Sequence, residues 1–252
     1  MDRATDRPTT CTNGRDLGRL ATEDGLVLRT GLLYRSDDTG WSQGPSPDLP
    51  APAATVFDLR RDNEVAERGL PPFVGPETAV VRNVLIPPEE SPANGGIDSD
   101  EAFGAFYARV FGDRREMLGG ILRRMADVKL PAVVYCVAGK DRTGVVVAAL
   151  ASVLGVRRQD IVRDYVRSER FMACLRSHGR LTERDVRGVV LPLHSARAVT
   201  INGFLTEVYG RFGQGPDLAC ALGLDERDVG RLRDRFLEAA PEAAGESRSA
   251  VP

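Results

Sequence analysis

Short runs of apolar and β-branched residues recur along the first half of the chain, each bounded by glycine, proline or charged residues. Runs of this length and composition predict buried β-strands rather than helices. We expect strands at residues 26–29, 32–36, 54–60, 80–86 and 131–135.

The second half of the chain carries apolar residues mainly at helical spacing. This spacing predicts helix over residues 100–128, with a break at Gly112 and Asp113, and the aromatic residues there are expected to be core rather than a substrate wall. Further helices are expected from Val145 to Gly155 and at residues 157–171, 196–212 and 225–238.

The segment of residues 40–53 contains four prolines, which exclude a continuous helix. We expect a loop there, with Trp41 packed over it.

The hydrophobic content of the chain fits a single domain. Its 252 residues, 42% of them hydrophobic, can bury one substantial core. We expect one folded domain over residues 13–238, a flexible N-terminus over residues 1–12, and a disordered tail of small and polar residues over 239–252.

The charge of the chain argues against dedicated nucleic-acid binding, because the formal net charge is −2 and the basic residues are spread along the whole sequence. No apolar run reaches the length of about 18 residues that a membrane-spanning helix needs. The N-terminus also lacks an apolar signal segment. We therefore expect a cytoplasmic protein without stable membrane insertion, with leaderless secretion as the alternative.

The four cysteines lie far apart, at positions 11, 136, 174 and 220, without a Cys-x-x-Cys pair. This spacing indicates neither a zinc site nor a disulfide framework. We expect free thiols in a reducing compartment.

One cysteine lies in a distinctive setting, between the strand at 131–135 and the buried helix that follows. Cys136 and Arg142 form a Cys-x5-Arg pattern, followed at once by Thr143 and Gly144. A loop that wraps around the start of a helix directs its backbone N–H groups inward, where the helix dipole adds positive charge. The segment therefore predicts an anion cradle with a nucleophile at its edge.

The cradle itself is expected to be Val137, Ala138, Gly139 and Lys140, together with Arg142. Glycine allows a tight turn, and a guanidinium can hold two phosphoryl oxygens in its planar fork. The same positive field favours the thiolate form of a cysteine. The pattern with both glycines and a serine or threonine after the arginine is expected about 0.0005 times by chance in a chain of this composition, so a buried structural cysteine beside an exposed arginine is the weaker interpretation.

The segment Cys136–Gly144 resembles the signature loop of the bacterial tyrosine-protein phosphatase family, which reads His-Cys-x-x-Gly-Lys-Asp-Arg-Thr-Gly. Tyr135 replaces the family's histidine, which helps to fix the cysteine loop. Weaker matches extend from about Asn13 to about Leu237. The resemblance implies an α/β cysteine-phosphatase fold, with a central, mostly parallel twisted sheet flanked by helices.

Several charged residues match the family outside this loop: Arg15, Asp16, Arg35, Asp58, Arg60, Glu64 and Asp164. For Arg15, Asp16 and Arg35 we favour a structural ion-pair network over substrate contact. For Asp58, a scaffold role paired with a nearby arginine is at least as favoured as catalysis. His178 and His194 are both expected at the surface.

The resemblance implies a two-step phosphomonoesterase. The Cys136 thiolate would attack phosphorus, Arg142 and the loop amides would stabilise the oxyanion, and a phosphocysteine would then be hydrolysed. Asp141 is the first candidate for the general acid and Glu89 the second, while Thr143 could hydrogen-bond the departing thiolate and Lys140 could favour dianionic substrates. No metal or cofactor is expected, since the loop supplies the positive charge.

The leading substrate is a phosphotyrosine protein, with phosphoinositide or dual-specificity activity as the alternative. Two other hypotheses remain. One is a phosphate-binding module without catalytic activity, which the replacement of the family's histidine by Tyr135 suggests. The second is an arsenate reductase or sulfurtransferase. Arsenate reduction would need a resolving cysteine, no second cysteine lies close in sequence, and only spatial closeness of Cys174 would support it.

Overall fold

A five-stranded sheet lies at the centre of the computed structural model, which describes residues 11–39, 48–91, 97–179 and 192–241. Its strand order is β1-β3-β6-β4-β5. All pairings are parallel except the one between β1 and β3. The strands are β1 Arg15–Asp16, β3 Leu33–Ser36, β4 Thr55–Asp58, β5 Ala79–Arg82 and β6 Ala132–Tyr135. The predicted fold class is confirmed.

Strand β6 lies in the middle of this sheet, and its register places the candidate site. Tyr135 is paired with Ser36 of β3 on one side and with Asp58 of β4 on the other. Because these three strands are parallel, their carboxyl ends meet at one edge, which is where sites form in open α/β sheets. Cys136 follows β6 directly at that edge.

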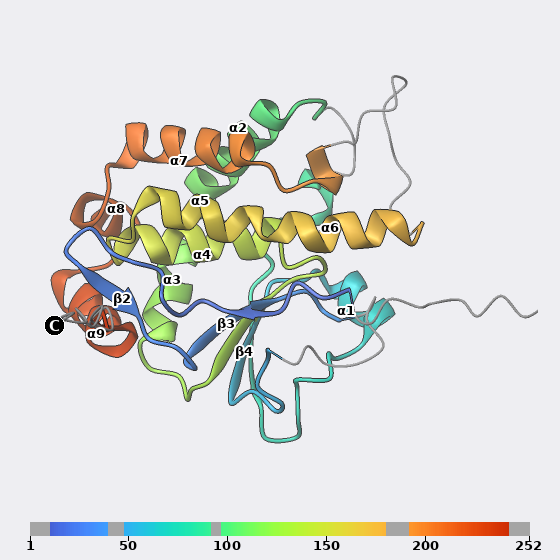
Figure 1. Cartoon of the computed structure of the whole chain (residues 1–252), viewed down its shortest axis with the longest axis horizontal. Helices are drawn as coiled ribbons and strands as arrows, with labels where there is room; N and C mark the ends of the chain where they lie inside the picture. Colours follow the sequence, from blue (N-terminus) through green and yellow to red (C-terminus); the bar gives the residue numbers. More distant parts are fainter. Residues whose placement is uncertain (1–10, 40–47, 92–96, 180–191, 242–252) are drawn as a thin grey trace, which may run out of the picture.

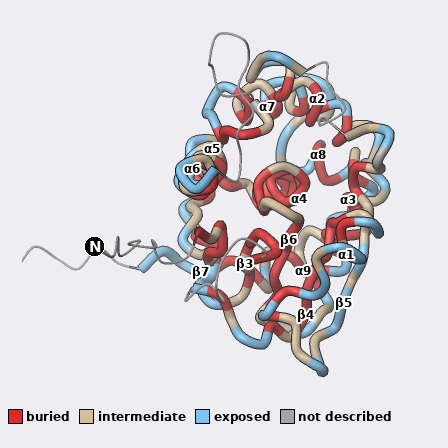
Figure 2. The backbone as a smooth tube through the Cα atoms, turned by 90° about the vertical axis from the view of Figure 1, so that its right-hand side faces the viewer, coloured by how far each residue is buried: buried red, intermediate tan, exposed pale blue. Residues whose placement is uncertain are grey.

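Helix α4, Asp141–Val153, follows the cysteine loop and is buried along its length from Arg142 onwards. Figure 2 shows it end-on, surrounded by other helices and lying above the sheet. Its run of valines has only modest helix propensity. Burial on all sides therefore stabilises this helix, since most helical stability in proteins comes from packing.

The other helices of the described residues cover the sheet and α4 (Figure 1). They are α1 Asp62–Arg68, α2 Asp100–Asp113, α3 Arg115–Met125, α5 Arg158–Val166, α6 Ser168–Ser177, α7 Ala198–Phe212, α8 Pro216–Ala221 and α9 Glu226–Phe236, with short 3-10 helices η1 Pro88–Glu90 and η3 Pro192–His194. None of the described helices is long and apolar enough to cross a bilayer.

The residues of β6 alternate between two apolar clusters, as expected for a strand with a period of two. Ala132, Val134 and Cys136 belong to the main core. Val133 and Tyr135 belong to a second cluster that contains Leu49, Ala53, Val56 and Phe73. The nucleophile candidate and its neighbouring tyrosine thus point to opposite faces of the sheet.

Several predicted elements differ in detail from the observed ones. The strand predicted at 26–29 is β2, Leu26–Leu28, which pairs with β7, Leu237–Ala239, in a separate two-stranded sheet. The break predicted within residues 100–128 falls at Arg114. The single helix predicted at 157–171 is divided into α5 and α6 at Arg167.

The predicted termini of the domain also need correction. Residues 1–12 were expected to be flexible, but Cys11 is buried and Thr12 hydrogen-bonds Asp37. Residues 239–252 were expected to be disordered, but Ala239 belongs to β7. Trp41 lies outside the described residues, and residues 48–53 contain no helix, as predicted.

Candidate active site

The loop between β6 and α4 forms one side of a cavity of about 220 Å³. Five of the predicted residues line this cavity: Cys136, Val137, Ala138, Asp141 and Arg142. Other lining residues come from distant parts of the chain: Arg61, Glu64, Ile86, Ser91, Met172, Leu175, Leu193 and His194. The structure thus brings most of the predicted loop residues together around one cavity.

The backbone of the loop is arranged to bind an anion. Among the described residues, the N–H groups of Val137 to Thr143 donate to no backbone carbonyl. The first helical hydrogen bond of α4 runs from Gly144 N–H to the Lys140 carbonyl. These N–H groups and the N-terminus of a 13-residue buried helix provide positive charge where a phosphate would lie.

Gly139 allows the loop to approach β3 closely. Its φ is +62°, and a Cβ at this position would lie 2.3 Å from the carbonyl oxygen of Ser36. Only glycine fits both the left-handed conformation and this contact. The expected role of Gly139 is therefore to shape the cradle, although it does not line the cavity.

A buried ion-pair network holds the loop from behind. Arg35 donates to the Gly139 carbonyl at 2.6 Å and to Asp164 at 2.6 Å, and Arg15 donates to Asp164 at 2.8 Å. Burial alone would raise the pKa of Asp164, but the two arginines lower it to about 2. The structural interpretation of Arg15 and Arg35 is confirmed, with Asp164 as the shared partner. Asp16 instead accepts backbone N–H groups of Gly18 and Gly31.

Arg142 is held in place by Glu64 of α1. Its two terminal nitrogens donate to the Glu64 carboxylate at 2.5 and 2.9 Å, and Nη1 also donates to the Leu59 carbonyl at 3.1 Å. Burial would raise the pKa of Glu64, but Arg142 and Arg61 lower it to about 2. From sequence, Glu64 was identified only as a family match, because its partner is 78 positions away.

These contacts leave part of the Arg142 guanidinium available for a ligand. Of its five N–H groups, Nη1 uses two on Glu64 and Leu59, and Nη2 uses one on Glu64. Nε–H and the second Nη2–H remain without a hydrogen bond to the described residues. They form a side-on fork, a geometry that matches two oxygens of a phosphate.

Asp141 lies at the start of α4, in contact with two buried side chains. The Tyr107 hydroxyl on α2 donates to its Oδ1, and Lys140 Nζ lies against the same oxygen. Burial raises the pKa of Asp141 to about 7. Its carboxyl is therefore protonated in part of the population near neutral pH, as a general acid requires. Tyr107 was expected only as part of a core stripe, and its polar contact was not foreseen.

Lys140 does not extend beside the cavity, contrary to the prediction. It is fully buried, with Nζ 4.9 Å from the centre of the Phe103 ring. Burial lowers its pKa to about 7. Lys140 thus contacts Asp141 rather than a bound anion, because the turn into α4 directs its side chain towards α2.

The remaining two catalytic candidates lie in different environments. Glu89 is exposed on η1 and does not line the cavity, so the geometry favours Asp141 over Glu89. Thr143 is fully buried in the first turn of α4, and its hydroxyl has no hydrogen-bond partner among the described residues. A hydroxyl in this position can donate to a nearby anion.

The outer wall of the cavity is largely apolar and comes from the C-terminal part of the chain. Met172 and Leu175 lie on α6, and Leu193 and His194 lie on η3. His194 was predicted to be a surface residue, but it is only 8% exposed and lines the cavity. The apolar run of residues 189–193 that precedes it in sequence was a signal that the prediction overlooked. His178 is exposed, as predicted.

Tyr135 fixes the sheet rather than the cysteine. Its hydroxyl donates to Asp58 at 2.7 Å and accepts from Arg60 at 3.2 Å, on the face opposite to the main core. Arg60 also binds both carboxylate oxygens of Asp58. The scaffold interpretation of Asp58 is therefore confirmed, and the tyrosine joins β6 to the end of β4.

The prediction that all four cysteines are free thiols is wrong. Cys11 and Cys174 form a disulfide, whereas Cys136 and Cys220 are free. The 163 positions between the two bonded cysteines hid this pairing. Spacing rules detect only cysteines that are close in sequence.

Comparison with known proteins agrees with this geometry. The model of the tyrosine phosphatase family matches residues 7–238. A "putative tyrosine-protein phosphatase" of Cupriavidus necator is 28% identical, with 90% of this chain and 86% of the relative covered. The triple specificity protein phosphatase PtpB of Mycobacterium tuberculosis is 30% identical, over 66% of this chain and 69% of the relative. A tyrosine-protein phosphatase of Nostoc commune is 24% identical, over 89% of this chain and 73% of the relative.

The family match covers nearly the whole described fold, including the loop, the buried helix and the residues that hold them. The relatives carry phosphatase names, and the cavity contains a cysteine, an arginine and open backbone amides. This chain is a phosphatase that belongs to the tyrosine phosphatase family.

Proposed function

We propose that this enzyme removes phosphate from phosphotyrosine in proteins through a covalent phosphocysteine on Cys136. The observation that carries the proposal is the cavity in which a buried free cysteine, a held arginine and the open amides of one loop meet. The family match and the names of the relatives support the same chemistry.

In the first step, the Cys136 thiolate attacks phosphorus in line with the bond to the leaving oxygen. The charge on the equatorial oxygens is stabilised by the loop N–H groups and by the free fork of Arg142. Glu64 fixes the plane of that guanidinium, because it holds both terminal nitrogens. The loop itself supplies the positive charge, so this chemistry asks for no metal ion.

The leaving alkoxide or phenoxide needs a proton. Asp141 lines the cavity and its pKa is raised to about 7 by burial, so we assign it this role. In the second step, its carboxylate accepts a proton from the water that attacks the phosphocysteine. The Thr143 hydroxyl is proposed to stabilise the departing thiolate.

The walls of the cavity support an aromatic phosphoester as substrate. Ile86, Met172, Leu175 and Leu193 are apolar, and an aryl ring gains free energy by burying its surface against such residues. A broader specificity is the second candidate, since PtpB of Mycobacterium tuberculosis is named a triple specificity phosphatase. Phosphoserine, phosphothreonine and phosphoinositides are the substrates that would distinguish it.

The test is phosphate release from a panel of phosphotyrosine, phosphothreonine and phosphoinositide substrates, with wild type and Cys136→Ser. We expect the highest kcat/KM on phosphotyrosine peptides and no detectable turnover by the variant. Turnover confined to lipids would overturn the protein substrate while keeping the chemistry. If both proteins were inert but bound phosphopeptide, the chain would be a phosphate-binding module.

The disulfide bears on one alternative to this proposal. An arsenate reductase would need a resolving cysteine, but Cys174 is bonded to Cys11 and Cys136 is free, which disfavours that hypothesis. The cytoplasmic location, the organisation as a single domain and the absence of nucleic-acid partners stay predictions.

A further inference from the structure

The Cys11–Cys174 disulfide joins the first described residue to helix α6. The two Cα atoms are 5.9 Å apart, a usual separation for a disulfide. Cys174 is half-buried, whereas Cys11 is only 9% exposed. An external reagent would therefore meet the sulfur of Cys174 before that of Cys11.

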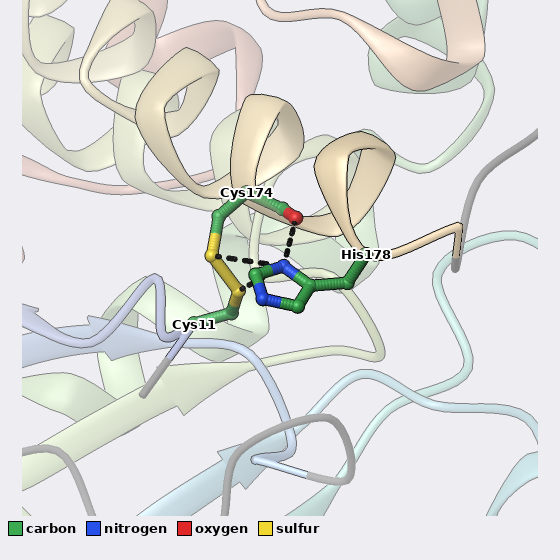
Figure 3. Close-up of side chains that lie close together, drawn as sticks. All are labelled: Cys11, Cys174 and His178. Carbon is green, nitrogen blue, oxygen red and sulfur yellow. Dashed lines mark hydrogen bonds between the residues drawn. A yellow bond between two sulfur atoms is a disulfide. The ribbon is translucent and has the colours of Figure 1, made fainter. Parts of the chain in front are cut away.

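A histidine lies against both sulfurs (Figure 3). His178 directly follows α6, four positions after Cys174, and its Nδ1 lies 3.8 Å from each Sγ. The same nitrogen lies 2.7 Å from the Cys174 carbonyl oxygen, which can only accept, so Nδ1 carries a hydrogen. In the disulfide form this hydrogen is donated to the carbonyl, but the same N–H lies beside both sulfurs. An N–H that turns towards a departing thiolate stabilises it, which makes that sulfur a better leaving group in thiol–disulfide exchange.

The disulfide is connected to the catalytic loop by packing. Cys11 belongs to an apolar cluster with Phe171, Met172 and Leu175, and Ala138 of the loop packs against this cluster. Met172, Leu175 and Ala138 also line the cavity. The same three residues therefore line the catalytic cavity and belong to the apolar cluster around the disulfide.

A second connection runs along the backbone from Cys11. The Asn13 side chain donates to the Ala138 carbonyl at 2.9 Å, and Asn13 N–H donates to Asp37 at 2.7 Å. The disulfide fixes the N-terminal end of this segment to α6. Cys11 lies two positions before Asn13, so loss of the disulfide would remove a covalent link beside a contact that holds the catalytic loop.

From these contacts we infer that Cys11, Cys174 and His178 form a thiol–disulfide exchange site, a reversible modification site that acts on phosphatase activity. The partner is a dithiol, either a small molecule or a dithiol protein. One thiolate of the dithiol attacks Cys174 Sγ, the bond to Cys11 breaks, and Cys11 leaves as a thiolate that takes up a proton. The second thiol of the dithiol then releases Cys174 as a thiol. The enzyme's disulfide gains two electrons and two protons, and the dithiol becomes a disulfide.

The chemical part of this inference is tested by counting thiols in the native full-length protein. Samples are equilibrated in buffers of oxidised and reduced dithiothreitol, alkylated, and weighed by intact-mass spectrometry. We expect two alkylated cysteines, Cys136 and Cys220, under oxidising conditions and all four under reducing conditions. Cys220→Ser, which removes an exposed cysteine outside the disulfide, should lower both counts by one. Four thiols at every ratio would overturn the site, as would two thiols at every ratio in the folded protein.

The role of His178 is tested by the rate of reduction. His178→Ala should slow reduction of the disulfide by dithiothreitol about threefold to tenfold, because the leaving thiolate loses its hydrogen-bond donor. An unchanged rate would exclude this role. A metal site is the competing outcome. In that case the reduced wild type would bind one Zn²⁺ and resist oxidation, and bound Co²⁺ would give thiolate charge-transfer bands. These results would show that the three residues hold a metal ion and that the exchange proposal is wrong.

The effect on activity rests on the proposed function, whereas the thiol counts do not. Reduction should lower kcat/KM for an aryl phosphate about threefold to tenfold, within the range carried by coupling through packed contacts. Dithiothreitol should not change the activity of a Cys11→Ser, Cys174→Ser double variant, and equal loss in that variant would contradict the link. Correct thiol counts with no hydrolysis by either form would mean that the proposed function, not the exchange site, has failed.

Discussion

The protonation of single residues in this site is set by burial and by the partners that each residue contacts. Asp141 and Glu64 both contact basic side chains, yet burial raises the pKa of Asp141 to about 7 and the paired arginines lower that of Glu64 to about 2. Glu64 is therefore a permanent anion that orients Arg142. Asp141 can give and take a proton near neutral pH.

Asp141→Asn tests this division. The acid must be protonated to act, and its pKa is about 7, so kcat of the wild type on phosphotyrosine should fall as pH rises above 7. The asparagine variant should lose about 10²-fold in kcat and lose this limb of the profile, because amide protons do not titrate there. Steady-state rates from pH 5 to about 9 measure both effects.

Glu89→Gln is the matched control, since Glu89 lies outside the cavity lining. It should keep the wild-type rate and pH profile. If Asp141→Asn kept the wild-type pH profile of kcat and Glu89→Gln flattened it, Glu89 would be the general acid.

Asp164 tests the buried ion-pair network. Asp164→Asn leaves two buried arginines facing a neutral amide, and breaking a buried pair costs about 3–5 kcal/mol. Asp160→Asn is the control on the same helix, because its partner Arg163 is 70% exposed and such pairs contribute at most about 1 kcal/mol. Urea unfolding of the wild type and the two variants measures the loss of unfolding free energy in each variant. Equal losses would show that the network does not stabilise the fold.

At the scale of elements, the catalytic loop depends on how closely it packs against β3. Gly139 and Gly179 have nearly the same positive φ, +62° and +64°. A Cβ at Gly139 would clash with Ser36, whereas a Cβ at Gly179 would meet nothing within 4 Å. Alanine substitutions at the two glycines therefore separate the stability lost through a positive φ from the stability lost through a steric clash.

Gly179→Ala should lower the free energy of unfolding by about 1 kcal/mol, the usual cost of a left-handed alanine. Gly139→Ala should cost at least about 2 kcal/mol more and should also abolish most activity, because the backbone of the loop must move. Thermal unfolding and phosphate release measure the two effects. If Gly139→Ala behaved like Gly179→Ala, the close approach to Ser36 would have no functional weight.

The elements also show what periodicity can predict. Strands β3, β4 and β6 and helices α2, α4 and α7 were predicted because each buries a run or stripe of apolar residues. Strand β5 was predicted although most of its residues are exposed, and the two-residue strand β1, Arg15–Asp16, was missed because it has no apolar residue. Helix α1 was missed because only Glu64 of its seven residues is buried. Strand β2 pairs with β7, about two hundred positions away in sequence. The local pattern of apolar residues cannot predict a partner at that distance.

At the scale of the whole molecule, the acidic groups make stability depend on pH in two opposite ways. Burial raises the pKa of Asp37 to about 6, so the folded state binds its proton more readily than the unfolded chain does. For Glu64 and Asp164, burial acts in the same direction, but paired arginines outweigh it and lower each pKa to about 2. These two groups hold their charge more firmly in the folded state.

The free energy of unfolding should therefore rise as pH falls from 7 towards 5, while Asp37 and Asp141, whose pKa burial raises to about 7, take up their protons. It should then fall from about pH 4.5 to about pH 2, where Glu64 and Asp164 stabilise the fold only while charged. At about 1.4 kcal/mol per pKa unit, these two groups together contribute several kcal/mol. Urea unfolding at a series of pH values measures the curve. A stability that rose steadily down to pH 3 would contradict it.

The site as a whole could be predicted only in its contiguous part. Cys136, Asp141 and Arg142 were found together because one loop contains them all. The distant partners were not assigned: Tyr107 at Asp141, His194 in the wall, and Cys174 bonded to Cys11. Each of these contacts is made by folding between segments whose sequences carry no mutual signal.

The most direct test of the account is rapid-quench trapping of the enzyme during turnover of an aryl phosphate. We predict a transient mass increase of one phosphoryl group, mapped to the peptide that contains Cys136, and its absence in Cys136→Ser. Asp141→Asn should lower the amount formed in the first turnover. A phosphoryl group on any other residue, or full turnover by Cys136→Ser, would contradict the central claim.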